Sequence, residues 1–230
     1  MRQPTLLACS HGTSSALGQA AVASLESAVK DRHEQVCSAF VDVQTPDVPT
    51  ALARIDGPVR VVPLLLSAGY HVYVDLTEAV ACRPEAILCA ALGPDPRLVR
   101  VLRQRLDEAG LRDSDQVVLA AAGSSDARAV QDCRATARML GQQLGRTVRV
   151  GFLSASQPRL SDVLTAARAR GSRVVVASYL LAPGYFADLV GQAGADVVSA
   201  PLLRPSWPVP VELVDVVLAR YHGRAPERHA

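Results

Sequence analysis

Two histidines stand where a short apolar run gives way to a turn, in the segments Ser10-His11-Gly12-Thr13 and Ser67-Ala68-Gly69-Tyr70-His71. A pair of neutral imidazoles suits borderline divalent ions such as Fe²⁺, Co²⁺, Ni²⁺ or Zn²⁺, whereas a structural zinc site needs four ligands. Two ligands would hold an ion loosely enough for it to pass to another molecule. Because the pKa of histidine lies near neutrality, the same side chains could also accept protons from that molecule. His11 and His71 are therefore predicted to bind metal and to take part in catalysis.

Other polar residues lie close to these histidines or to the ends of neighbouring strands. Asp42, at the end of the next apolar run, could orient a histidine or take a proton onward, or it could only cap a turn. Gly12 permits a tight turn, after which Thr13 or Ser14 could cap a helix. Hydroxyls and helix-start amides could equally bind carboxylates of a substrate. The substrate-binding candidates are Ser10, Gly12, Thr13, Ser14, Gly69 and Tyr70.

The chain that must position these side chains alternates short aliphatic runs with longer amphipathic segments. This pattern predicts an α/β fold in which helices cover both faces of a parallel sheet. In the first half the predicted strands are 5–9, 36–43, 59–66 and 86–90, and the predicted helices are 14–32, 47–55, 72–82 and 95–109. Ligands of open parallel sheets bind beyond the carboxyl ends of the strands, and His11 and His71 follow two such ends.

The second half repeats this order. Its predicted strands are 117–121, 147–153, 173–181 and 196–199, and its predicted helices are 125–144, 158–170, 185–193 and 209–221. Residues 65–71 (LLSAGYH) match residues 180–186 (LLAPGYF), which indicates an internal duplication. In the second copy Ala122 and Phe186 replace the two histidines, and Ser154 replaces Asp42. A residue that the fold needs would more often persist in both copies, so the joint loss favours a site that is used once.

A polar, turn-forming segment at 110–115 (GLRDSD) separates the two halves and is the natural linker. We expect a first domain at 1–112, which carries the histidines, and a degenerate second domain at 116–230. Two similar domains that face each other would enclose a cleft, with the second domain as its other wall. Because one chain would supply both walls, we expect a monomer.

Composition argues against several other classes of protein. The 230 residues carry a net charge of only +2, no basic run and 4% aromatic residues, so no nucleic-acid partner is expected. No stretch is long and apolar enough to span a bilayer, and the N-terminal apolar run is too short for a signal peptide. The five cysteines show no CxxC spacing and fit reduced thiols, so we predict a cytoplasmic protein without a membrane partner.

Four segments resemble the class II chelatases, the sirohydrochlorin cobaltochelatase and ferrochelatase family, in its two-domain form with a degenerate second half. They are residues 10–13 (SHGT), 39–46 (AFVD through Pro46), 62–75 (VPL through GYH, with Asp75) and 91–96 (ALGPDP). The resemblance covers nearly the whole chain. It implies two flavodoxin-like or Rossmann-like domains in which His11 and His71 bind metal. Many members of this family carry Glu where this chain has Asp42, which is one methylene shorter.

The same resemblance implies an activity. A chelatase of this kind inserts Fe²⁺ or Co²⁺, with Ni²⁺ as a further candidate, into a sirohydrochlorin-type tetrapyrrole on the way to sirohaem or cobalamin. The partners expected are therefore the tetrapyrrole and the metal ion. Because the metal is a substrate, no permanent cofactor is expected.

Other functions match parts of the pattern less well. Histidine phosphatases also place a His-Gly turn after a first strand, but they need an arginine before that histidine, where this chain has Ser10. A serine hydrolase would need a Gly-x-Ser-x-Gly elbow, which the sequence lacks. A non-catalytic tetrapyrrole carrier or metal chaperone would use the same histidines, so this alternative stays open.

Overall fold

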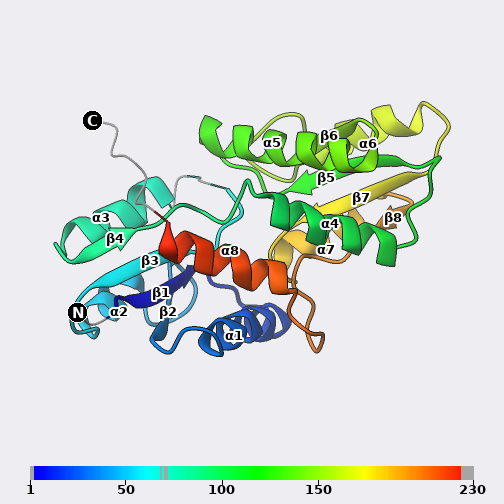
Figure 1. Cartoon of the computed structure of the whole chain (residues 1–230). Coiled ribbons are helices and arrows are strands. Elements are labelled where there is room, and N and C mark those ends of the chain that lie inside the picture. Colours follow the sequence, from blue (N-terminus) through cyan, green and yellow to red (C-terminus); the bar gives the residue numbers. More distant parts are fainter. Residues whose placement is uncertain (1–2, 68, 70–71, 224–230) are drawn as a thin grey trace.

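The computed structural model describes residues 3–67, 69 and 72–223, which form two α/β units (Figure 1). The first unit comprises β1 (Thr5–Ser10), α1 (Ala16–Lys30), β2 (Val36–Phe40), α2 (Val48–Ala53), β3 (Val59–Pro63), the π-helical turn η1 (Val72–Leu76), α3 (Thr77–Ala81), β4 (Ala86–Leu88) and α4 (Pro96–Glu108). The second comprises β5 (Gln116–Ala121), α5 (Ala127–Leu144), β6 (Val148–Phe152), α6 (Leu160–Arg168), β7 (Val174–Tyr179), α7 (Tyr185–Gln192), β8 (Val197–Val198) and α8 (Val211–His222). The expected duplicated α/β fold is confirmed.

Each unit contains one parallel four-stranded sheet, with the orders β2-β1-β3-β4 and β6-β5-β7-β8. The central strands β1 and β7 are buried along their whole lengths, as expected for strands that are covered on both faces. β1 pairs with both β2 and β3, and the Leu64 N–H donates to the Cys9 carbonyl at 2.7 Å just beyond the ladder. The ends of β1 and β3 therefore lie next to each other, as the histidine hypothesis requires.

The apolar core has three parts. One cluster lies around α2 on one face of the first sheet, and another lies around α6 on one face of the second. The third cluster is shared by both units and includes Leu6 of β1, Leu25 of α1, Leu119 of β5, Leu140 of α5 and Val217 of α8. Because this cluster is continuous, burial of apolar surface holds the two units together.

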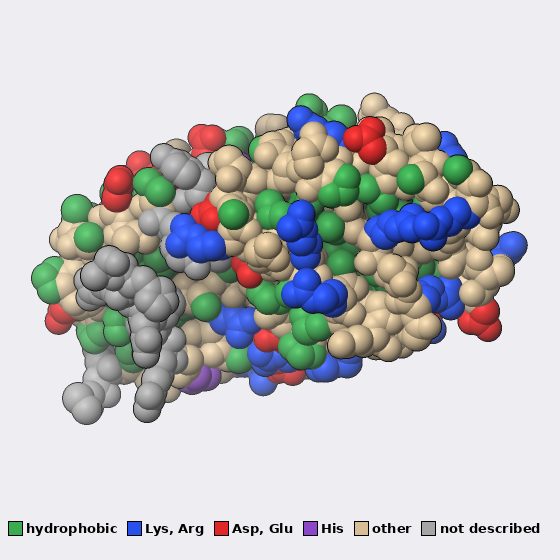
Figure 2. Space-filling view, turned by 90° about the horizontal axis from the view of Figure 1, so that it is seen from above, with side chains coloured by type: hydrophobic (Ala, Val, Ile, Leu, Met, Phe, Trp, Pro, Cys, Tyr) green, Lys and Arg blue, Asp and Glu red, His purple; other side chains and the backbone are tan. Residues whose placement is uncertain are grey.

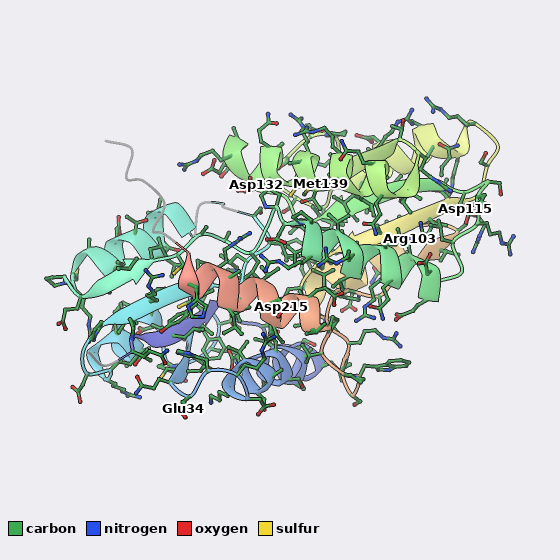
Figure 3. All side chains as sticks on the ribbon, viewed as in Figure 1. Glu34, Arg103, Asp115, Asp132, Met139 and Asp215 are labelled. Carbon is green, nitrogen blue, oxygen red and sulfur yellow. The ribbon has the colours of Figure 1, made fainter. Side chains whose placement is uncertain are left out.

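Two helices cross between the units (Figure 1). α4 packs against α5 and β7 of the second unit, whereas α8 packs against α1 and β3 of the first. Arg220 of α8 donates to the carbonyls of Ala91 and Leu92, both at 2.7 Å. Asp215 of α8, labelled in Figure 3, pairs with Arg32 at 2.6 Å. The last helix of the chain, α8, therefore packs on the first sheet. The division of the chain into domains at 1–112 and 116–230 stays a proposal.

Several strands end earlier than the sequence predicts, and β2 and β3 differ most. The strand expected at 36–43 ends at Phe40, because the Asp42 carboxylate accepts a hydrogen bond from the Val43 N–H at 2.7 Å and turns the chain. Val43 then has a φ of 65°, which lies outside the range of a strand. β3 likewise ends at Pro63 instead of residue 66. Both runs continue as apolar sequence, so hydrophobicity alone could not locate their ends.

The expected linker is attached to the second unit. Arg173 pairs with the buried carboxylate of Asp115 at 2.9 Å and donates to the Gly110 carbonyl at 3.2 Å. Arg146 donates to the carbonyls of Arg112 and Asp115, both at 3.0 Å. Figure 3 shows Asp115 at the edge of the second unit. These bonds fix the path of the chain between the two sheets.

The surface carries dispersed charge. On the face shown in Figure 2, Lys and Arg side chains occur at several separate places instead of in one patch. That distribution is consistent with the net charge of +2. In the part of the chain that the structure describes, no helix combines the length and apolarity that a membrane span requires.

Candidate active site

A cavity of about 740 Å³ lies between the two units. Its wall is formed mainly by residues 10–14 and 64–67 of the first unit and residues 121–125 and 179–187 of the second. These segments lie at the carboxyl ends of β1, β3, β5 and β7, so the two units contribute equivalent loops. Sites for small molecules typically have volumes of about 300–1,000 Å³. A cleft lined by both halves is thus present, as the duplication predicts.

The predicted site residues that line this cavity are Ser10, His11, Gly12, Thr13, Ser14 and Gly69. His11 directly follows β1 and is exposed. Because β1 and β3 are paired neighbours, the segment that leaves β3 starts beside the His11 loop. His71 and Tyr70 lie outside the described residues. The convergence of the two imidazoles therefore stays a prediction.

Asp42 supports the His11 loop through its backbone. The Asp42 N–H donates to the His11 carbonyl at 2.9 Å, and the Asp42 carboxylate accepts from the Val43 N–H at 2.7 Å. Asp42 is exposed and is not among the described residues that line the cavity, whereas Val43 and Gln44 are. The structure thus gives Asp42 a turn-capping role, and its part in proton transfer stays a prediction.

The turn that carries His11 requires glycine at position 12. Gly12 has a φ of +90°, and a Cβ atom there would lie only 2.0 Å from the Asp42 carbonyl oxygen. In the second unit Gly123 has a φ of +96°, and its Cβ would lie 1.9 Å from the matching carbonyl oxygen. The two turns are built alike although Ala122 replaces His11. The histidine is therefore not needed to form the turn.

Two of the hydroxyls at the start of α1 serve the backbone. The N-cap is Ser15 instead of Thr13 or Ser14, and its side chain accepts from the Gly18 N–H at 3.3 Å. Thr13 Oγ1 accepts from the Ser15 N–H at 3.1 Å. Sequence reasoning placed the cap too early because three consecutive hydroxyl residues are equally good candidates. Within the described residues the Ser14 side chain makes no hydrogen bond, so it is best placed to contact a ligand.

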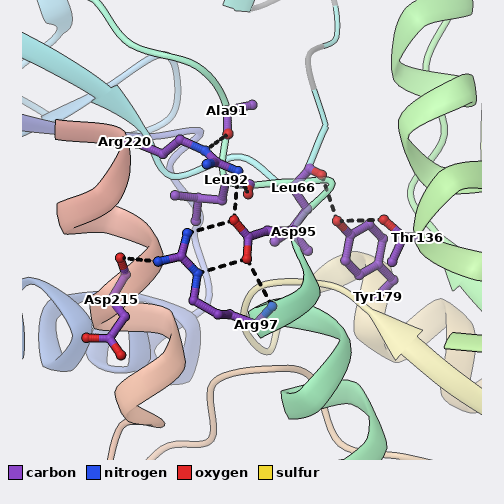
Figure 4. A network of polar contacts seen from close by, with 9 residues as sticks. All are labelled: Leu66, Ala91, Leu92, Asp95, Arg97, Thr136, Tyr179, Asp215 and Arg220. Atoms are coloured by element: carbon purple, nitrogen blue, oxygen red, sulfur yellow. Dashed lines mark hydrogen bonds and ion pairs between the residues drawn. The ribbon is translucent and has the colours of Figure 1, made fainter. Parts of the chain in front are cut away.

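A contact between the units fixes the cavity wall at residues 64–67. Tyr179, at the end of β7, donates from its buried hydroxyl to the Leu66 carbonyl at 2.8 Å, and the Thr136 hydroxyl donates to the Tyr179 hydroxyl at 3.3 Å (Figure 4). Burial raises the pKa of Tyr179, so its phenol stays protonated and donates. A Cβ at Gly93 would lie 2.2 Å from the Tyr179 hydroxyl, so glycine leaves room for this bond. The sequence did not point to Tyr179 or Thr136, because the tyrosine is visible there only as the last residue of an aliphatic strand.

A second polar cluster lies behind this wall (Figure 4). Asp95 caps α4 by accepting from the Arg97 N–H at 2.9 Å, and it pairs with the guanidinium groups of Arg97 at 2.8 Å and Arg220 at 3.1 Å. Burial acts to raise the pKa of Asp95, but the hydrogen bonds and charges of the two arginines outweigh it and lower the pKa. None of these three residues is among those described as lining the cavity. The cluster joins α4 to α8 and is structural.

Cys133 is among the residues that line the cavity, and its thiol is protonated in the metal-free protein. Burial raises its pKa to about 12, and the Asp132 carboxylate acts in the same direction against a hydrogen bond with Ser67. The form that binds metals is the thiolate, which is scarce at neutral pH. Among the residues with described positions, no three His, Cys, Asp or Glu side chains form a metal-binding group. His11 is therefore the described cavity residue best suited to bind a divalent ion.

Comparisons with known proteins agree on the fold. SirB from Bacillus subtilis with Fe³⁺ superposes with a TM-score of 0.79 at 20% identity, covering 96% of this chain and 95% of that chain. The sirohydrochlorin chelatase SirB from Bacillus subtilis subspecies spizizenii in complex with cobalt has a TM-score of 0.76 at 16% identity, covering 96% and 94%. CbiX, described as the terminal enzyme for biosynthesis of sirohaem in denitrifying bacteria, has a TM-score of 0.68 at 21% identity, covering 94% and 98%.

At these identities the solved structures establish a common fold over nearly the full chain. A sequence search of curated proteins gives no significant match. The model of the CbiX family matches residues 5–109 and 116–197, which takes in a large part of each unit. The chain therefore belongs to the CbiX family.

Proposed function

We propose that this protein is a sirohydrochlorin chelatase, which inserts Fe²⁺ or Co²⁺ into a sirohydrochlorin-type tetrapyrrole for sirohaem or cobalamin biosynthesis. The observation that carries the proposal is the position of His11 on the wall of a 740 Å³ cavity to which both units contribute. The similar structures support it, because SirB is named as a sirohydrochlorin chelatase and was solved with Fe³⁺ and with cobalt. Membership of the CbiX family supports it further.

Metal insertion requires two tasks of the protein. It must hold an ion that can still leave, and it must accept the two protons that the pyrrole nitrogens lose as the ion enters. Two neutral imidazoles, those of His11 and His71, would bind the ion and leave its other coordination positions open to the macrocycle. As the ion moves to the pyrrole nitrogens, the two imidazoles are freed and can each accept one of the two protons. Asp42, which contacts the His11 backbone, is the group we propose for passing the proton of His11 onward.

The rim of the substrate carries carboxylates, which need donors. The N-terminus of α1 opens onto the cavity at residues 10–14, and the positive end of a helix favours anions. The Ser14 hydroxyl is exposed there. We propose that this segment binds rim carboxylates, and the full set proposed for substrate binding is Ser10, Gly12, Thr13, Ser14, Gly69 and Tyr70.

The test follows the absorbance of sirohydrochlorin under anaerobic conditions with Fe²⁺ or Co²⁺. The wild-type protein should insert metal over many turnovers, faster than the protein-free reaction. His11→Ala and His71→Ala should each lower the rate about 100-fold or more with the melting temperature retained. His222→Ala is the matched control, because His222 is exposed at the end of α8 and is not among the described cavity residues.

Two results would count against the proposal. A spectral change that stops after one equivalent would indicate a tetrapyrrole carrier or metal chaperone instead of an enzyme. Equal rates for His11→Ala, His222→Ala and the wild type would show that the site is misplaced.

A further inference from the structure

Two exposed apolar side chains stand on the wall of the cavity. The large hydrophobic residues exposed within the described chain are Leu17, Val43, Ile87, Tyr185, Trp207 and Val211. Of these, Val43 of the first unit and Tyr185 of the second line the cavity, with 58% and 71% of their surfaces exposed. Single exposed apolar residues are common on protein surfaces, so the position of each has to be judged by its own surroundings.

Val43 occupies a backbone position that disfavours valine. Its φ of 65° lies in the left-handed region, which β-branched residues avoid. Hydrogen bonds fix the turn on both sides of it, since the Val43 N–H donates to the Asp42 carboxylate and the Gln44 N–H donates to the Asp42 carbonyl, both at 2.7 Å. The turn alone would therefore favour glycine or asparagine at position 43.

The second unit contains the same turn, of which Ser154 lines the cavity. Ala155 has a φ of 50°, and the Ser156 N–H donates to the Ser154 carbonyl at 2.6 Å, as at the Val43 turn. Ala155 is exposed and is not among the described cavity residues. The left-handed position thus carries a branched side chain in the turn where that residue lines the cavity, and a single methyl group in the turn where that residue is not among the described cavity residues. The difference indicates that the valine serves contact with a ligand.

Tyr185 approaches the cavity from the second unit. It begins α7 directly after Gly184, at which a Cβ would lie 3.4 Å from Thr13 Oγ1. Tyr185 therefore directly follows a segment that packs on the loop that contains His11 in the first unit. Its ring meets the ring of Phe186 edge-on at 5.5 Å. Within the described residues its hydroxyl makes no hydrogen bond, and 71% of its surface stays exposed beside this ring contact.

We propose that Val43 and Tyr185 form an apolar lip that receives the flat face of the macrocycle. The proposal rests on the proposed chelatase function and names the residues that bind the substrate's conjugated ring. A planar conjugated ring is apolar on its faces and carboxylated only at its rim, so the lip and the polar segment at residues 10–14 match different parts of the same molecule. Contact with the lip would stabilise the bound ring to the same extent before and during metal insertion. Val43 and Tyr185 are thus proposed as substrate-binding residues.

The lip is tested by titrating metal-free sirohydrochlorin anaerobically into Val43→Gly, Tyr185→Ala and the double variant, and by measuring the melting temperature of each. Val43→Gly should raise the Kd about fivefold to twentyfold while its melting temperature equals or exceeds that of the wild type. Tyr185→Ala should raise the Kd at least as much, and the double variant should raise it further. In turnover assays KM should rise with the Kd, and kcat should stay within about twofold.

Ala155→Gly is the matched control, because it places glycine at the equivalent left-handed position of the second unit and Ala155 is not among the described residues that line the cavity. It should leave both the Kd and KM at their wild-type values. The lip is refuted if Val43→Gly and Tyr185→Ala bind sirohydrochlorin like the wild type while His11→Ala still abolishes insertion, an outcome that leaves the chelatase function intact. If the wild type itself does not bind sirohydrochlorin, the lip and the proposed function fall together.

Discussion

Removing the Tyr179 hydroxyl by Tyr179→Phe should weaken the junction between the two units. In the native protein this hydroxyl donates to the Leu66 carbonyl at 2.8 Å and receives a 3.3 Å contact from Thr136 (Figure 4). No other hydrogen bond to the Leu66 carbonyl is found among the described residues. The variant leaves this carbonyl unpaired, at a cost of about 1–3 kcal/mol. For a chain of this size the melting temperature should fall by about 2–12 °C.

Urea unfolding and differential scanning calorimetry measure this loss. Tyr185→Phe removes an equivalent hydroxyl from an exposed ring, so it should change the unfolding free energy by less than about 0.5 kcal/mol. Because residues 64–67 lead toward His71, Tyr179→Phe should also slow metal insertion in the fraction that is folded. A loss of stability no larger than that of Tyr185→Phe would refute the role given to the contact.

The remaining predictions concern charge, thiols and the His11 turn. Asp95→Asn should lower the unfolding free energy by about 2 kcal/mol at pH 7. Because the native pKa of Asp95 is lowered, the difference in unfolding free energy from the wild type should be full above about pH 4 and should shrink as the pH falls further. A difference that does not depend on pH would contradict this. A thiol reagent at pH 8 should rapidly label Cys37 and Cys82, which are exposed, and should label the buried cysteines only when the protein unfolds. Rapid labelling of a third cysteine would contradict the burial of Cys9, Cys89 and Cys133. Gly12→Ala should cost about 3–5 kcal/mol in chemical denaturation because its Cβ would clash with the Asp42 carbonyl. Gly57→Ala, with a φ of +79° and nothing within 4 Å of the added atom, should cost only about 1 kcal/mol, and equal losses would show that the clash is relieved.

Much of the fold could be predicted because its signals are local. The buried runs of β1 and β7 and the amphipathic α5 are visible in the order of apolar residues, and the same succession of strands and helices recurs in the second half. The position of His11 follows from a general rule, since loops after parallel strands form the binding edge. These are the features on which the candidate site depends.

The features that were missed depend on contacts distant in sequence. Tyr179 and Leu66 are 113 residues apart, and neither has a neighbour in sequence that indicates the bond. The crossing of α8 to the first sheet likewise arises from burial of the shared core, which periodicity cannot assign to one sheet or the other. The sequence predicts a strand at Val43 because valine is typical of strands, whereas the turn at Asp42 imposes a φ of 65° on it.

The proposed function requires a divalent ion to bind at His11 inside the cavity between the units. Anomalous diffraction from crystals grown with Co²⁺ measures this directly. We expect a cobalt peak about 2.1 Å from an imidazole nitrogen of His11, with the imidazole of His71 as a second ligand and the remaining positions open to the cavity. A cobalt peak elsewhere on the protein, with neither imidazole bound to metal, would contradict the proposed site.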